Sequence, residues 1–255
     1  KFYGGYEMLK EILLQVEKPA RYIGNEINMV KKNPEETDIR IAFCFPDVYE
    51  VGMSHLGLQI LYYFFNRRED TYCERCFAPW YDMEEKMREN NMPLFALETG
   101  DPLNKFDFVA FTLQYEMSYT NIINMLDLSG IPIWSKDRGE NDPIVIAGGP
   151  CAYNPEPLAD IIDVFYIGEG EVSYDEFLDL YREMKKSGCT KKEFLEKCLK
   201  IEGIYVPKFY DVKYKEKGEI ESFTPNHPDA PKVIKKVIVK DMDTAFYPEK
   251  QLVPL

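Results

Sequence analysis

The sequence predicts an α/β fold built around a doubly wound parallel sheet, followed by a small β-containing extension. Short apolar runs rich in β-branched and aromatic residues alternate with segments of helical periodicity. Most of these runs end in a loop that contains glycine or proline, as residues 39–45 do at Pro46. The sequence shows no internal repeat or low-complexity tract. Because ligands bind beyond the carboxyl ends of parallel strands, we expect a pocket at that edge of the sheet.

The spacing of the apolar residues predicts the elements in chain order. A first helix covers residues 6–17 and ends before Pro19, and a polar loop then leads to the strand 39–45. Further strands are expected at residues 71–77, 94–97, 107–113, 143–147 and 163–167, and helices at residues 54–65, 82–90, 118–128 and from after 171 to 186. Residues 204–206, 209–214 and 219–223 form an expected antiparallel β unit with a tight turn, and residues 233–239 one more strand. We therefore expect a lead-in over residues 1–38, an α/β domain over 39–200, and a β extension with a linker over 201–255.

Length, charge and cysteine content narrow the class of protein. The 255 residues are 45% hydrophobic and 29% charged, which is typical of a globular chain, and no apolar run is long enough to span a membrane. A net charge of −13 counts against a nucleic-acid-binding surface, so neither nucleic acid nor a membrane is an expected partner. Four of the six cysteines are scattered singly, as in proteins with reduced thiols, and we expect a cytoplasmic protein.

Four loops that follow predicted strands supply the candidate ligand-binding residues. The first, Asp47-x-Tyr49-x-x-Gly52, is by itself better explained by an ordinary strand-to-helix turn, because Asp caps helices and Gly accepts a positive φ. The other three loops would meet the same pocket, because parallel strand ends lie at one edge and glycine leaves room for a ligand. Their candidate residues are Thr112, Gln114, Gly148, Gly149, Gly168, Glu169 and Gly170.

Several longer stretches resemble a known family. They are residues 21–26, 45–57, 77–84, 111–121 and 148–160. These stretches resemble the amino-terminal region of an uncharacterised radical S-adenosylmethionine (SAM) family with a cobalamin-binding-like domain. The resemblance implies a flavodoxin-like or Rossmann-like domain in which the four loops bind cobalamin. It also implies that the [4Fe-4S] cluster and SAM belong to a catalytic core outside this sequence, and that this core is the partner of the domain.

Two departures from the family pattern decide the expected chemistry. Tyr49 stands where cobalamin-binding domains carry the histidine that ligates cobalt, and a phenol with a pKa near ~10 is a poor ligand. We therefore expect any bound cobalamin to be base-off, with no protein nitrogen on cobalt. Radical SAM enzymes hold their cluster by Cys-x-x-x-Cys-x-x-Cys, which this sequence lacks, and Cys73 and Cys76 are interpreted as ordinary thiols of a strand. No catalytic residue and no metal ligand is assigned to this chain.

Two functions stay open at this point. In the first, the chain is an accessory cobalamin-binding module of a radical SAM enzyme, serving methyl transfer or another radical modification. In the second, it is a non-enzymatic α/β scaffold of the same fold that docks a partner and has lost the cofactor. The glycines of the expected pocket suit both functions, so the sequence does not separate them.

Overall fold

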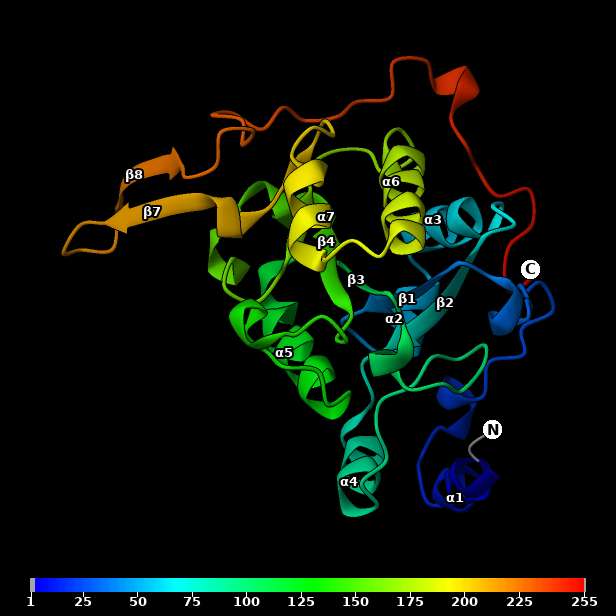
Figure 1. The fold of residues 1–255 in the computed structure, drawn as a ribbon. Coiled ribbons are helices and arrows are strands. Elements are labelled where there is room, and N and C mark those ends of the chain that lie inside the picture. Colours follow the sequence, from blue (N-terminus) through cyan, green and yellow to red (C-terminus); the bar gives the residue numbers. More distant parts are fainter. Residues whose placement is uncertain (1–2, 255) are drawn as a thin grey trace.

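The computed structural model describes residues 3–254, which are organised around one six-stranded sheet (Figure 1). In the order in which they lie side by side, the strands are β2 (Thr71–Phe77), β1 (Ile39–Phe45), β3 (Phe108–Thr112), β4 (Ile144–Gly148), β5 (Val164–Tyr166) and β6 (Ile204–Tyr205). The first five strands are parallel, and β6 pairs with β5 in the antiparallel direction. The order 2-1-3-4-5 is that of a flavodoxin-like sheet, so the predicted fold class is confirmed.

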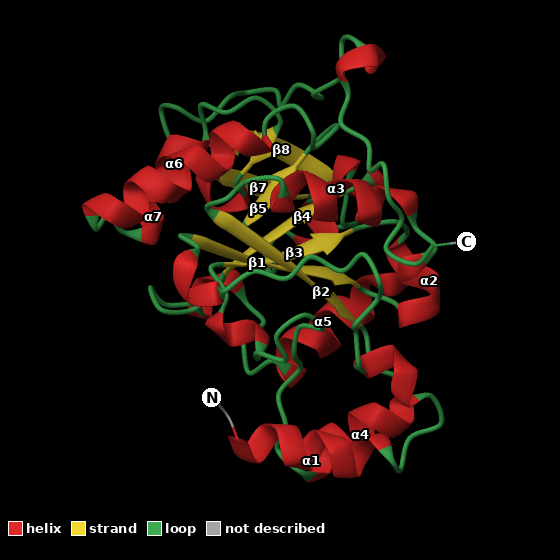
Figure 2. Ribbon diagram, turned by 90° about the vertical axis from the view of Figure 1, so that its right-hand side faces the viewer, coloured by secondary structure: helices red, strands yellow, loops and turns green. Residues whose placement is uncertain are grey.

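Helices cover both faces of this sheet (Figure 2). One layer contains α3 (Leu56–Asn66), α6 (Tyr174–Ser187) and α7 (Lys191–Cys198), and the other contains α4 (Tyr81–Glu89) and α5 (Tyr119–Leu128), with α1 (Tyr3–Leu13) on the same side. A short helix, α2 (Tyr49–Met53), follows β1. Because both faces are covered, β1 to β5 are buried along nearly their whole length. This burial is the reason that most residues of these strands are apolar.

Local sequence signals set the ends of the helices. The His55 side chain caps α3, because its Nδ1 accepts a hydrogen bond from the Leu58 N–H at 3.2 Å. Thr190 and Glu193 form a capping box at the start of α7. Gly188 ends α6 in the left-handed conformation, with φ of 69°. These caps set where α3 begins, where α6 ends and where α7 begins.

A two-stranded antiparallel hairpin stands away from the sheet (Figure 1). It consists of β7 (Tyr210–Tyr214) and β8 (Ile220–Pro225), and the turn between them contains Gly218 with φ of 81°. We call residues 207–226 the arm. The expected antiparallel unit is therefore present, except that residues 204–206, expected in this unit, contribute β6 to the edge of the main sheet.

The last described residues, 227–254, form an extended segment over the domain, which we call the strap (Figure 1). The ring of Phe246 lies 5.8 Å from that of Phe64 on α3. Leu252 is fully buried, and its carbonyl accepts a hydrogen bond from the Asn28 N–H at 3.3 Å. The strap thus fastens the helical layer to the lead-in.

Two expected strands are reduced to single bridges. Within residues 94–97 only Phe95 pairs, with Pro102, and within residues 233–239 only Val237 pairs. In the described part of the chain, no helix is both long enough and apolar enough to cross a membrane.

Candidate functional site

A crevice of about 180 Å³ opens at the carboxyl ends of β1, β3, β4 and β5, where the sequence predicts a pocket. Leu61 and Phe65 of α3 and Tyr174 of α6 form one side of it. A Cβ on Gly170 would lie 2.5 Å from the Tyr174 ring, so this glycine lets the loop pack closely on α6. Seven of the ten candidate residues line the crevice, namely Thr112, Gln114, Gly148, Gly149, Gly168, Glu169 and Gly170. The fold therefore brings the three later loops together.

The loops after β3 and β4 hold each other in place. Gln114 Nε2 donates to Thr112 Oγ1 at 2.5 Å, and the Leu113 N–H donates to the Gly148 carbonyl at 2.7 Å. Gly149 has a φ of 106°, and a Cβ there would lie 2.8 Å from the Leu113 carbonyl oxygen. A Cβ on Gly148 would meet only ordinary contacts, the nearest at 3.5 Å. The backbone itself thus requires glycine at position 149 but not at position 148.

The strap covers the loop after β5. Gly168 has a φ of 131° and forms a parallel bridge with Val237, whose backbone lies where a Cβ of Gly168 would be. The Glu169 N–H donates to the Val237 carbonyl at 3.0 Å, and the Glu169 carboxylate accepts a hydrogen bond from the Val239 N–H. The space that glycine leaves at position 168 is therefore filled by the chain itself.

Asp47, Tyr49 and Gly52 do not line the crevice. Asp47 Oδ1 accepts a hydrogen bond from the backbone N–H of the next residue at 2.7 Å. The Tyr49 hydroxyl donates to Glu26 Oε1 at 2.7 Å, and burial together with the Glu26 carboxylate raises the pKa of this phenol. A Cβ on Gly52 would lie 2.3 Å from the Phe77 ring, so this glycine lets α2 pack on β2. The motif thus forms a strand-to-helix turn, but not for the expected reasons, because the Asp47 side chain does not cap α2 and Gly52 lies inside α2 without a positive φ.

Tyr49 belongs instead to a buried ionic network around Arg75 of β2, which sequence reasoning missed. The Arg75 side chain is fully buried and donates two hydrogen bonds to Glu26, at 2.7 and 2.9 Å, and one to Glu98 at 2.7 Å. Burial raises the pKa of Glu98 even though Arg75 opposes the shift. For Glu26, burial also acts to raise the pKa, but hydrogen bonds and the charge of Arg75 lower it overall. This network joins the lead-in, α2 and the sheet.

The preceding residue, Glu74, points to the opposite face of β2. It is fully buried and accepts hydrogen bonds from Arg40 at 2.5 Å and from the Thr99 hydroxyl at 2.5 Å. Burial raises the pKa of Glu74 to about 7, although Arg40 acts in the opposite direction. Two adjacent opposite charges inside an apolar strand were the sequence signal for both clusters.

Exposed apolar side chains follow the carboxyl end of each of the five parallel strands, and we call this set the carboxyl-end face. Its members are Val51, Leu56, Trp80, Tyr81, Tyr115, Met117, Tyr153 and Val172. They lie in the loops and in the first helical turns that follow the five parallel strands. Met117 is 79% exposed and Tyr81 63% exposed. Large apolar side chains that share one edge of a domain are typical of an interaction surface.

The crevice gives little room for cobalamin. Its volume of about 180 Å³ is below the ~300–1,000 Å³ of ordinary small-molecule pockets. Tyr49, which stands at the position of the cobalt ligand, is turned to Glu26. Within residues 3–254 no group of three His, Cys, Asp or Glu side chains is placed to hold a metal ion. Cys73 and Cys76 are buried in β2. Cobalamin binding stays a prediction.

A family model described as radical SAM proteins, N-terminal, matches residues 57–207. The chain belongs to this family. It is 31% identical over 171 residues to an uncharacterized protein of Methanocaldococcus jannaschii, an alignment that covers 66% of this chain and 32% of the relative. The chain thus spans about a third of the length of that relative. No solved structure matches the chain. The membership agrees with the radical SAM part of the resemblance and leaves the cobalamin part as an expectation.

Proposed function

We propose that this chain is a non-enzymatic α/β module of a radical SAM protein, and that it docks the remaining part of that protein against its carboxyl-end face. Membership in the family of amino-terminal regions supports the connection with a radical SAM protein. The carboxyl-end face is the observation that carries the proposal, because it exposes eight large apolar side chains after five neighbouring strands. In a domain without a partner, exposing these apolar side chains to water would contribute nothing to stability.

The composition of the carboxyl-end face suits a protein partner. Trp, Tyr and Met are enriched in protein interfaces, where rigid aromatic side chains serve as anchors. Trp80 is held in position before any partner binds. Its backbone N–H donates to the Tyr22 hydroxyl at 3.0 Å, and the Arg21 guanidinium lies 5.3 Å from its ring centroid. An anchor that is already ordered loses little conformational entropy on binding.

The inward-facing groups support a structural function and not a catalytic one. The carboxylates of Glu26, Glu74 and Glu98 are engaged by arginines inside the domain. The backbone of Val237 in the strap fills the space beside Gly168, so no ligand can occupy that space. Both features favour a scaffold.

Thermal unfolding of the full-length protein by calorimetry tests the docking. We expect one cooperative transition in the wild type, because a docked interface couples the two parts. Met117→Glu and Tyr81→Glu should each divide this transition into two, because a carboxylate in the interface must lose its hydration and so weakens the docking. Leu14→Glu is the matched control, because Leu14 is 89% exposed and lies outside the carboxyl-end face. Separate transitions already in the wild type, or no effect of either variant, would contradict the docking.

Cobalamin binding is the second candidate function. The observation that favours it is the convergence of seven candidate residues from three loops at one crevice. If the residues of the crevice bind cobalamin, the group would supply cobalt chemistry to the radical SAM protein. Mixing the purified chain with hydroxocobalamin and desalting it separates the two proposals. A stoichiometric corrin spectrum after desalting would favour the cofactor, and its loss would favour the scaffold.

A further inference from the structure

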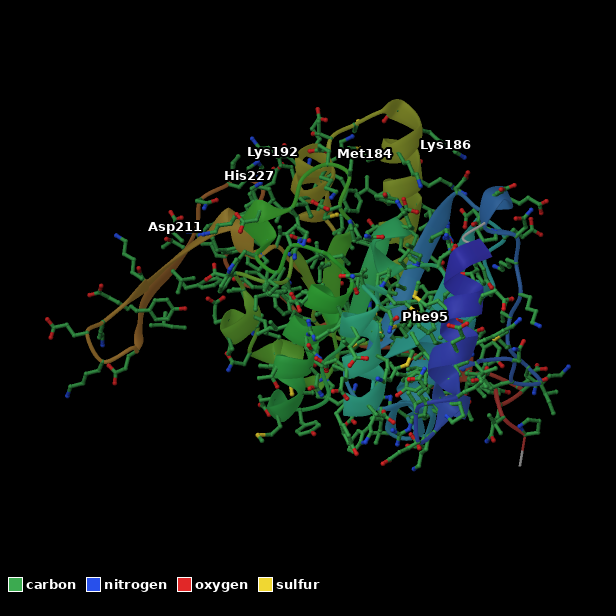
Figure 3. All side chains as sticks on the ribbon, turned by 90° about the horizontal axis from the view of Figure 1, so that it is seen from below. Phe95, Met184, Lys186, Lys192, Asp211 and His227 are labelled. Atoms are coloured by element: carbon green, nitrogen blue, oxygen red, sulfur yellow. The ribbon has the colours of Figure 1, made fainter. Side chains whose placement is uncertain are left out.

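The strap contains a strongly basic stretch on an acidic chain. The strap begins at His227, near the base of the arm (Figure 3), and soon reaches residues 231–240, which we call the basic segment. The basic segment contains four lysines and no acidic residue, whereas the whole chain has a net charge of −13. All four lysines are exposed, namely Lys232, Lys235, Lys236 and Lys240. The basic segment is therefore a local positive surface.

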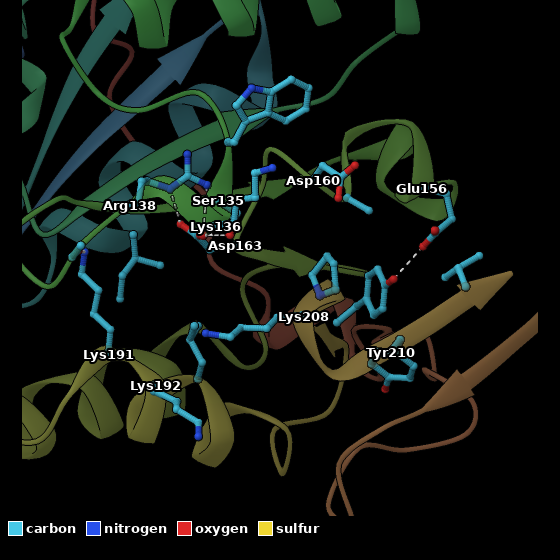
Figure 4. Close-up of a pocket in the computed structure, with 18 of the residues that line it drawn as sticks. Ser135, Lys136, Arg138, Glu156, Asp160, Asp163, Lys191, Lys192, Lys208 and Tyr210 are labelled. Atoms are coloured by element: carbon cyan, nitrogen blue, oxygen red, sulfur yellow. Dashed lines mark hydrogen bonds and ion pairs between the residues drawn. The ribbon is translucent and has the colours of Figure 1, made fainter.

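The charges of the basic segment are not neutralised within the described part of the chain. None of its four ammonium groups forms an ion pair with a described carboxylate, and that of Lys236 lies 5.4 Å from the Tyr153 ring centroid. In the cleft of about 890 Å³ between the arm and the body, by contrast, Arg138 pairs with Asp163 at 3.0 Å and Lys191 donates to a backbone carbonyl (Figure 4). Like charges that lie close together repel one another, so an acidic partner would relieve the repulsion within the basic segment.

The backbone of the basic segment is paired along one edge and open along the other. The Val237 N–H donates to the Ile167 carbonyl at 3.0 Å, and the Val237 carbonyl accepts a hydrogen bond from the Glu169 N–H at 3.0 Å. Successive residues of an extended strand direct their N–H and C=O groups to opposite edges, so those of Lys236 and Ile238 face away from the domain. Within residues 3–254 these groups form no hydrogen bond. They are the open edge of a strand.

The side chains beside the open edge select an acidic strand as the partner. Val233 is 74% exposed and Ile238 56% exposed, so a pairing strand would also cover apolar surface. Lysines on an open edge oppose pairing with the same segment of a second copy, because like charges would meet. A polynucleotide would neutralise the lysines, but it has no strand backbone to match the open edge.

The position of the basic segment indicates the source of that strand. Lys236 contacts Tyr153, and Val237 bridges Gly168 in the loop after β5 that also carries Val172. Tyr153 and Val172 are members of the carboxyl-end face. The basic segment is thus continuous with the surface on which the remaining part of the polypeptide is proposed to dock.

We propose that an extended acidic segment from the remaining part of the radical SAM protein pairs with the open edge of the basic segment as an added β-strand. The added strand bonds to the backbone of Lys236 and Ile238, and its carboxylates neutralise the exposed lysines. This pairing explains why the expected strand 233–239 is reduced to one bridge here, because its second partner belongs to the remaining part of the protein. The inference rests on the proposed function, since it names a segment that docks beside the carboxyl-end face.

Hydrogen exchange of the full-length protein, resolved to single amides by electron-transfer fragmentation, tests the pairing. We expect the Lys236 and Ile238 amides to exchange slowly in the wild type, because they donate to the added strand. The double variant Lys232→Glu/Lys235→Glu should speed both at least about tenfold, since carboxylates would then face carboxylates. The Val237 amide, which donates to Ile167, should stay slow and so show that the strap is still in place. Lys217→Glu, in the exposed turn of the arm, is the matched charge control and should have no effect.

Ile238→Pro tests the backbone pairing separately from the charges. Proline fits extended backbone and removes the open-edge N–H. It leaves the Val237 and Val239 N–H groups, which bond to the domain, in place. Ile238→Ala keeps the N–H of residue 238 and is the matched control. The Lys236 amide should exchange at least about tenfold faster in Ile238→Pro than in Ile238→Ala.

Three outcomes would overturn this inference. The first is fast exchange of Lys236 and Ile238 in the wild type while residues 114–118 exchange slowly, which leaves the docking intact and removes only the added strand. The second is slow exchange that either the double lysine variant or the proline variant leaves unchanged. The third is exchange that slows as the protein concentration rises, which would assign the open edge to a second copy. If residues 114–118 also exchange fast, the docking itself has failed and the inference fails with it.

Discussion

Replacing Arg75 by methionine is expected to remove a large part of the stability of this protein. The guanidinium is fully buried and donates three hydrogen bonds to two carboxylates, those of Glu26 and Glu98. Methionine keeps an unbranched side chain but leaves both carboxylates without their counter-charge. Removing one partner of a buried ion pair costs about 3–5 kcal/mol. That loss is large beside the about 5–15 kcal/mol by which domains are usually stable.

Urea unfolding followed by circular dichroism measures this loss, with Arg88→Met as the control. Arg88 is half exposed and pairs with two carboxylates that are at least partly exposed, so its replacement should cost no more than about 1 kcal/mol. Without Arg75, the pKa values of Glu26 and Glu98 should be higher in the folded than in the unfolded chain. The folded state of Arg75→Met then binds more protons than its unfolded state. The loss in its free energy of unfolding, relative to the wild type, should therefore shrink as the pH falls from 7 toward 5. A deficit no larger than that of Arg88→Met, or one that is independent of pH, would refute this reasoning.

Three further predictions concern the loops and the buried side chains. Gly149→Ala should lower the melting temperature more than Gly148→Ala, because only position 149 combines a φ of 106° with a Cβ 2.8 Å from a carbonyl oxygen. Equal decreases in the melting temperature of the two variants would contradict this reason. Burial raises the pKa of Glu74 from 4.5 to about 7, so stability should fall as the pH rises through this range. In urea titrations, Glu74→Gln should reduce this decrease in the free energy of unfolding with pH. If the variant kept the pH dependence of the wild type, the decrease would not come from Glu74. Peptide mass spectrometry should find that iodoacetamide modifies the partly exposed Cys151 before the buried Cys76, whereas the reverse order would be inconsistent with the packing of β2.

The fold could be predicted because strands covered on both faces leave an unmistakable pattern. The expected strand 107–113 contains the continuous apolar run 108–111, and the structure has β3 within it. β6 was not placed in the main sheet, because a two-residue strand has no periodicity and its position depends on the free edge of β5. Residues 233–239 are rich in β-branched side chains, but only Val237 lies beside a backbone that can pair with it.

The candidate site was predictable where topology alone decides position. Strand ends of a parallel sheet meet at one edge, so residues as distant as Thr112 and Gly170 reach the same crevice. The direction of Tyr49 was not predictable, because it depends on Glu26 from the lead-in and on Arg75 from the edge strand. Those contacts join segments that no local pattern connects.

Hydrogen exchange at the carboxyl-end face tests the central claim most directly. Peptides from residues 78–82 and 114–118 are followed by mass spectrometry in this chain and in the full-length radical SAM protein, with the loop around Gly188 as an internal reference outside the face. The docking account predicts slower exchange of both peptides in the full-length protein and no change at the reference loop. Equal exchange of the two peptides in both proteins would contradict the claim that this face receives the rest of the polypeptide.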